Sequence, residues 1–170
     1  MKIDWLSSTL IRPPARLGLC AIPGRTGSPH ATLLDLDALV FQGVTHVIAF
    51  VEPKEFAKMN PPESPEDRKQ ALAQRGIDFF YQPIPDQTAP TLRQTREVLE
   101  YIEHAIRGDA SLVLHCWAGL GRAGTFAASY LISQGYGAEE AIDLIRWTRP
   151  FSIQSPEQEQ FLRDYAATRI

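Results

Sequence analysis

Short apolar runs alternate along the chain with longer segments in which apolar residues recur every three or four positions. The short runs are rich in β-branched or aromatic residues and bounded by Gly or Pro, which predicts buried strands; they cover 16–23, 45–51, 77–84 and 111–116. The periodic segments predict helices; they cover 33–41, 66–76, 91–107, 122–134, 138–149 and 156–168. The first fifteen residues show no clear pattern.

Two segments are defined by their turn and cap residues. Residues 53–65 contain four prolines, which predicts an irregular loop. Ser155 stands where a helix cap belongs, Pro156 follows it at the first helical position, and Gln158 lies three residues after the cap. That spacing predicts the start of the last helix.

The alternation of strands and helices predicts an α/β fold. We expect a single domain over 1–170, with a mainly parallel sheet of four to five strands flanked by helices. Ligands of such sheets bind beyond the carboxyl ends of the strands. Candidate chemistry is therefore sought in the loops that follow strands.

Composition and charge exclude several other classes of protein. The chain is 44% hydrophobic with a net charge of −3, so we expect no nucleic-acid or membrane partner. No apolar run reaches about 18 residues, and no signal-peptide pattern is visible. The two cysteines, Cys20 and Cys116, predict free thiols in a reducing cytoplasm. The histidines lack metal-ligand spacing, so no metal is expected, and a monomer is assumed.

The loop from Cys116 to Arg122 combines features that suit an anion. Cys116 ends a predicted strand, and a helix follows whose N-terminus offers free N–H groups. Gly119 and Gly121 allow those groups to converge on a phosphate, and Arg122 adds a planar charged fork. The same field favours the thiolate form of Cys116. The plainer interpretation, a core cysteine and a surface arginine beside an ordinary turn, leaves this coincidence unexplained.

The sequence "HCWAGLGRAG", residues 115–124, resembles the HCX5R signature of cysteine-dependent protein tyrosine and dual-specificity phosphatases. "LGLCAIPG", "PIPD" and "IQSPEQEQFL" resemble its compact branch, the kinase-associated phosphatase type. The resemblance implies a phosphocysteine on Cys116, a transition state held by Arg122, and His115 as a residue that holds the loop and tunes the thiolate. The resemblance implies that no cofactor is needed. It also implies that the phosphate is bound by the loop residues Trp117, Ala118, Gly119, Leu120, Gly121 and Arg122.

A general acid and a positioned water complete such a reaction. A carboxylic acid must protonate the departing oxygen, and the resemblance assigns this role to Asp86 in the loop 81–90. A turn-forming Asp between prolines is the structural alternative, and Glu52 is the reserve acid. Gln154 and Gln158 resemble the paired glutamines that position water in the family, although Gln158 also fits a capping box.

The sequence departs from the family pattern after the arginine, where Ala123 replaces the usual Ser or Thr. Without that hydroxyl beside the sulfur, we expect slow breakdown of the phosphoenzyme. Thr125 compensates only if its side chain turns inward.

The predicted function is hydrolysis of phosphotyrosine in a phosphoprotein or phosphopeptide, with phosphoserine and phosphothreonine as further substrates. The loop contains no lysine, which argues against inositol phosphates. One alternative is a pseudophosphatase that captures phosphoproteins. A second alternative is a different thiolate enzyme, such as a sulfurtransferase or arsenate reductase. The loop with Asp86 and the two glutamines fit this alternative less well.

Other residues have structural interpretations beside functional ones. Trp117 either lines the rim of the site or wedges the loop against the core. Cys20 is expected in the core, with a redox partnership to Cys116 as the alternative. Trp147 and Phe151 are expected to pack in the interior. Arg25 and Arg149 are expected at the surface, where either arginine could contact a phosphosubstrate.

Overall fold

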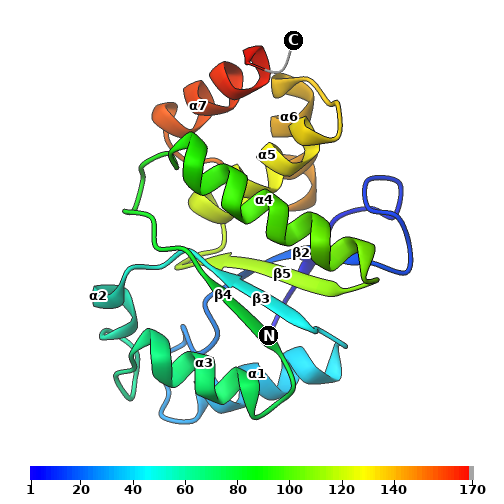
Figure 1. The fold of residues 1–170 in the computed structure, drawn as a ribbon. Helices are drawn as coiled ribbons and strands as arrows, with labels where there is room; N and C mark the ends of the chain where they lie inside the picture. The colour runs from blue at the N-terminus through cyan, green and yellow to red at the C-terminus, as the bar shows by residue number, and fades with distance from the viewer. Residues whose placement is uncertain (169–170) are drawn as a thin grey trace.

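The computed structural model describes residues 1–168 and shows an α/β fold with one mixed sheet (Figure 1). Within these residues the sheet has five strands in the order β1-β2-β5-β3-β4. Their bounds are β1 Asp4–Trp5, β2 Arg16–Ala21, β3 His46–Ala49, β4 Asp78–Tyr81 and β5 Ser111–Cys116. All neighbouring pairs are parallel except β1 with β2. The predicted mainly parallel sheet is confirmed.

The centre of the sheet places the ends of three strands at one level. β5 is buried along its whole length and pairs with β2 on one side and β3 on the other. His115 lies opposite Cys20 in β2 and opposite Ala49 in β3. The loops that follow these strands therefore leave the sheet at the same edge, where the predicted Cys-to-Arg loop begins.

Helices cover both faces of the sheet (Figure 1). On one face lie α1 (Ala31–Phe41) and α3 (Pro65–Ala73), which enclose a smaller apolar cluster. On the other lie α4 (Leu92–Arg107), α5 (Gly121–Ser133), α6 (Ala138–Thr148) and α7 (Pro156–Ala167), which enclose the larger cluster. Among the described residues, none of the helices has the length and apolar character needed to cross a membrane.

The helix α5 is central to the second layer because it is almost completely buried. Every residue from Gly121 to Ile132 is buried, and most of them are small. Small side chains let α5 pack closely against the sheet and against α4, α6 and α7. The N-terminus of α5, where the site lies, is therefore held from several sides.

Three expectations about the elements are wrong. The segment 53–65 begins with a short helix, α2 (Pro53–Phe56), and β1 lies in the unpatterned start. Elements of four and two residues are too short to show a period. Trp147 and Phe151 do not pack in the core, since they are 89% and 83% exposed.

Candidate active site

The loop between β5 and α5 is pressed against the end of β2. Cys116 is the last residue of β5 and is 3% exposed, and Gly121 is the first residue of α5. Gly119 has a φ of +73°, and a Cβ there would lie 2.0 Å from the carbonyl oxygen of Cys20. The Ile22 N–H donates to the Trp117 carbonyl at 3.2 Å. Only glycine at 119 allows this close approach.

The other side of the loop is fixed by the segment between α6 and α7. The Arg149 Nη2 donates to the Ala118 carbonyl at 2.8 Å, and its Nη1 forms an ion pair with Asp4. The Ile153 N–H donates to the Leu120 carbonyl at 3.2 Å. The loop carbonyls are thus tied to surrounding segments.

The backbone N–H groups of this loop have no such ties. No N–H of residues 117–121 has an acceptor within the described residues. Converging free N–H groups at the start of a helix form an anion site. Trp117 is half-buried and packs against the larger apolar cluster, which supports its interpretation as a wedge.

Arg122 is held in place by a buried carboxylate. Its side chain is 1% exposed, and its Nη1 and Nη2 donate to the two oxygens of Glu55 at 2.7 and 2.8 Å. Nη1 also donates to the Ile84 carbonyl at 3.1 Å. Burial raises the pKa of Glu55, but the hydrogen bonds from Arg122 and the Glu52 N–H, together with the charges of Arg122 and Lys58, outweigh it, so the pKa of Glu55 is lowered and the pair stays charged.

Glu55 was not singled out by the sequence analysis. It lies in α2, where its side chain also accepts from the backbone N–H of Glu52 at 2.7 Å in a capping box. The spacing of Glu52, Pro53 and Glu55 is the signal that could have revealed the short helix. Nothing in that signal points to Arg122, which is 67 residues away.

The second edge of the Arg122 guanidinium faces Asp86. Nη2 lies 3.1 Å from an Asp86 oxygen, and Nε is buried without a partner among the described residues. Glu55 occupies the edge formed by Nη1 and Nη2, so the edge formed by Nε and Nη2 remains. An arginine edge with two parallel N–H groups binds two oxygens of a phosphate.

Asp86 is 60% exposed and lies on the loop between β4 and α4. Two contacts connect that loop to the start of α7. The Ala89 N–H donates to the Glu157 carboxylate at 3.0 Å, and the Gln158 Nε2 donates to the Thr88 carbonyl at 3.2 Å. The acid loop and the glutamine segment are therefore joined, with Asp86 directed at Arg122.

The two glutamines occupy different positions. Gln158 is fully buried, and its Oε1 accepts from the N–H groups of Gln154 at 2.9 Å and Ser155 at 3.3 Å. Gln154 is exposed. A Cβ on Gly121 would lie 3.1 Å from the Gln154 Oε1 and 3.1 Å from the Gln158 Nε2. Both amides thus reach the loop, and Gln158 also connects it to the acid loop.

His115 is fully buried and precedes Cys116 in β5. Its Nδ1 lies 3.3 Å from the carbonyl oxygen of Cys116, and its Nε2 has no partner among the described residues. Burial, and then the charges of Arg68 and Arg122, lower the pKa of His115 to about 3. The imidazole is therefore neutral near pH 7, and its contact with the loop is to the backbone of Cys116.

Three residues that left alternatives open have clear positions. Ala123 is fully buried, and the Thr125 hydroxyl donates to the Gly121 carbonyl at 2.8 Å, so Thr125 does not serve the sulfur. Glu52 pairs with the exposed Lys54 at 2.9 Å and has no contact with Arg122 within the described residues. The catalytic roles themselves stay predictions.

A cysteine and an arginine around a loop of free N–H groups, with an aspartate facing the arginine, define a cysteine-dependent phosphatase. A family model described as "Polymorphic toxin system, DSP-PTPase phosphatase" matches residues 23–136. The chain therefore belongs to the DSP-PTPase family, and it is a cysteine-dependent dual-specificity phosphatase.

The relatives agree with this assignment. The chain is 29% identical over 170 residues to cyclin-dependent kinase inhibitor 3 of Sus scrofa, covering 97% of this chain and 78% of the relative. Among solved structures, kinase associated phosphatase with a serine in place of its catalytic-site cysteine is 27% identical, with a TM-score of 0.86, covering 100% of this chain and 98% of that one. The active form of Tk-PTP is 29% identical, with a TM-score of 0.73 and 92% of each chain covered.

Proposed function

We propose that the protein hydrolyses phosphate esters on protein side chains through a phosphocysteine intermediate. The Cys116 thiolate attacks phosphorus while the bond from phosphorus to the side-chain oxygen breaks. The loop N–H groups and the free edge of Arg122 hold the phosphate oxygens as charge develops on them. Asp86 gives its proton to the departing oxygen.

The second half-reaction returns the enzyme to its starting state. A water held near Gln154 attacks phosphorus, its proton passes to Asp86, and the bond between phosphorus and sulfur breaks to release phosphate and the thiolate. Gln154 suits this role because it is exposed and its Oε1 would lie 3.1 Å from a Cβ on Gly121. Gln158, which is fully buried, is assigned to holding the acid loop.

The substrate class follows from what surrounds the loop. Residues 117–121 carry no basic side chain, which favours a phosphorylated protein over a polyanionic inositol phosphate. We assign phosphotyrosine as the main substrate, with phosphoserine and phosphothreonine accepted. Both cysteines are free thiols, which suits a reducing compartment such as the cytoplasm.

The observation that carries this proposal is the edge of Arg122 formed by Nε and Nη2, which Glu55 leaves open and Asp86 faces. The test is the turnover of para-nitrophenyl phosphate by the wild type, Cys116→Ser and Asp86→Asn, with stopped-flow detection of a burst. We expect a burst in the wild type, no turnover in Cys116→Ser, and a loss of about 100-fold or more in Asp86→Asn. Phosphate analogues that bind a wild type with no turnover would instead establish a capture protein.

A further inference from the structure

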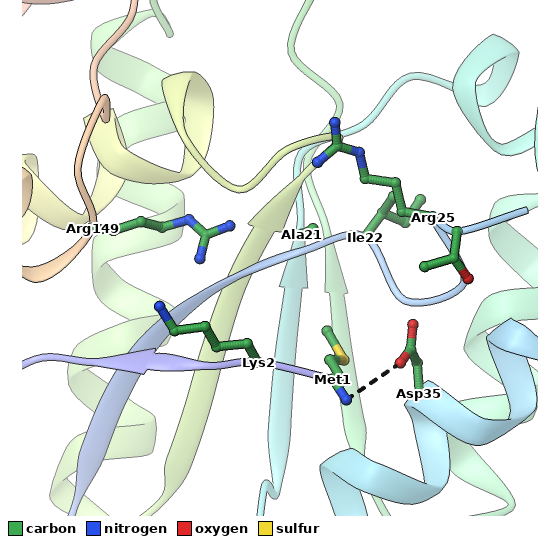
Figure 2. Close-up of a pocket in the computed structure, with 8 residues that line it drawn as sticks. Met1, Lys2, Ala21, Ile22, Arg25, Asp35 and Arg149 are labelled. Atoms are coloured by element: carbon green, nitrogen blue, oxygen red, sulfur yellow. Dashed lines mark ion pairs between the residues drawn. The ribbon is translucent and has the colours of Figure 1, made fainter.

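We propose that a basic hollow beside the phosphate loop binds a second anionic group of the same protein substrate, either an acidic side chain or a second phosphorylated residue. This inference rests on the proposed function. The hollow has a volume of about 480 Å³, and its walls include Lys2, Arg25 and Arg149, which come from three separate segments of the chain (Figure 2).

The hollow shares a wall with the phosphate site. Ala21 lines it, and Ala21 is the register partner of Cys116, so the two backbones are about one strand spacing of 4.8 Å apart. Ile22 also lines it and donates to the Trp117 carbonyl. A peptide with its phosphorylated residue over Cys116 therefore has neighbouring residues within reach of the hollow.

The charges around the hollow leave a positive excess. Asp4 pairs with both Lys2 and Arg149, and Asp35 accepts the Gly24 N–H at 2.8 Å. Three cationic side chains against the carboxylates of Asp4 and Asp35 leave one positive charge, without counting the terminal ammonium of Met1 that faces Asp35 (Figure 2). This excess stands out in a chain whose net charge is −3.

Arg25 provides that excess charge. It is exposed on the loop after β2, and its side chain has no ion pair or hydrogen-bond partner within residues 1–168. Arg149, by contrast, is fixed to Asp4 and the Ala118 carbonyl, and its buried Nε has no acceptor among the described residues. Arg25 and Arg149 line the same hollow, and a guanidinium without a partner suits the planar oxygens of a carboxylate or a phosphate.

The test compares two phosphotyrosine peptides that differ only at the residues next to the phosphotyrosine, which are Glu in one and Ala in the other. We expect the wild type to prefer the acidic peptide in kcat/KM by about three- to five-fold, the range of an exposed ion pair. Arg25→Ala should remove this preference while para-nitrophenyl phosphate turnover stays unchanged. Arg12→Ala, at another exposed arginine without a partner among the described residues, should keep it.

Binding of the two peptides to Cys116→Ser separates failure of this inference from failure of the proposed function. A preference for the acidic peptide that Arg25→Ala removes, in a protein that turns over no phosphate ester, would leave the hollow as a subsite and reject the phosphatase reaction. An active enzyme with the same preference in wild type and Arg25→Ala would overturn the subsite. Binding of inorganic phosphate that depends on Arg25, with no peptide preference, would also overturn it.

Discussion

At the residue scale, Arg122 divides its donors between structure and chemistry. Glu55 and the Ile84 carbonyl take the donors at one end of the guanidinium, and the edge with Nε remains for substrate. Burying a guanidinium is costly unless a carboxylate faces it. Burial lowers the pKa of Arg122, but the hydrogen bonds with Glu55 and the charges of Cys116, Glu55 and Asp86 together outweigh it, so the pKa is raised. Glu55 thus holds Arg122 in position.

Glu55→Gln tests this arrangement. The amide keeps one acceptor but removes the charge opposite a buried arginine, so we expect about 3 kcal/mol less free energy of unfolding and at least a ten-fold lower kcat/KM. Urea unfolding and para-nitrophenyl phosphate kinetics measure both. Glu52→Gln is the control, since Glu52 pairs with the exposed Lys54. Equal effects of the two changes would show that Glu55 does not hold Arg122, or that Glu52 acts in the reaction.

Ala123→Ser restores the hydroxyl that the family usually has after the arginine. The position is buried beside the site, and the Thr125 hydroxyl donates to the Gly121 carbonyl, so Thr125 does not take its place. A charge-assisted bond to the leaving sulfur is worth about 1.5–3 kcal/mol, so steady-state turnover should rise about ten- to a hundred-fold if phosphoenzyme breakdown limits the wild type. Stopped-flow measurement should show a smaller burst relative to the steady state.

The control for that change is Ala127→Ser, one turn further along the buried helix α5. It adds the same hydroxyl away from the loop, and we expect turnover close to that of the wild type. Unchanged burst and steady-state rates in Ala123→Ser would contradict the assignment of Ala123 as the cause of slow turnover.

At the scale of elements, the acid loop depends on α7 for its position. The Glu157 carboxylate accepts the Ala89 N–H, and Gln158 donates to the Thr88 carbonyl. These contacts bring Asp86 and the glutamine segment together although they are about 70 residues apart in sequence. The loop that carries Asp86 and the glutamine segment are therefore joined by two contacts.

Glu157→Ala breaks one of these contacts from an exposed position. We expect kcat for para-nitrophenyl phosphate to fall about three- to ten-fold because the acid loop becomes less well placed, with little change in stability. Glu66→Ala is a matched control, since Glu66 also follows the proline that starts a capped helix. A similar loss in both variants would assign the effect to the helix N-terminus rather than to the acid loop.

Periodicity predicted the long elements because their buried residues repeat. α6 shows where that approach stops. Its buried positions are Ala141, Ile142 and Ile145, and Trp147 falls on the opposite side of the helix, so a large aromatic residue within an apolar pattern is nonetheless exposed. The Cys-to-Arg loop was visible because its residues are local in sequence. Glu55 was not, because its role depends on a contact between distant segments.

At the scale of the whole molecule, the sheet separates the two cysteines. Cys20 belongs to the smaller apolar cluster and Cys116 to the larger one on the opposite face. Cys20 is opposite His115 in the register, whereas Cys116 is opposite Ala21. Burial raises the pKa of Cys20 to about 12, so its thiol is unreactive near neutral pH. This placement supports the core role of Cys20 over a redox partnership.

Stability of the whole molecule should depend on pH through His115. The pKa of this imidazole is about 3 in the folded protein, below the unfolded value near 6.5. Its contribution is complete above pH 6.5 and is lost as the pH falls, because only the unfolded chain then takes up the proton. Between pH 6.5 and 5 we expect a loss of about 2 kcal/mol, at roughly 1.4 kcal/mol per pH unit.

Urea unfolding at several pH values measures that slope, and the range stays above that of the carboxylates. His115→Asn should flatten the curve, since an amide does not titrate. His46→Asn should flatten it less, because His46 is only partly buried and its pKa is lowered less. A wild-type curve that is level between pH 6.5 and 5 would show that His115 takes up a proton in the folded state.

The ion pair between Asp86 and Arg122 also has a consequence for product release. Asp86 is tethered to the fold and contacts the donor that inorganic phosphate would use, so it acts as an intramolecular competitor at an effective concentration in the millimolar range or above. Each departing phosphate is replaced by a carboxylate that is already present. We therefore expect Asp86 to weaken inhibition by the phosphate product, so that the enzyme can keep working where free phosphate is abundant.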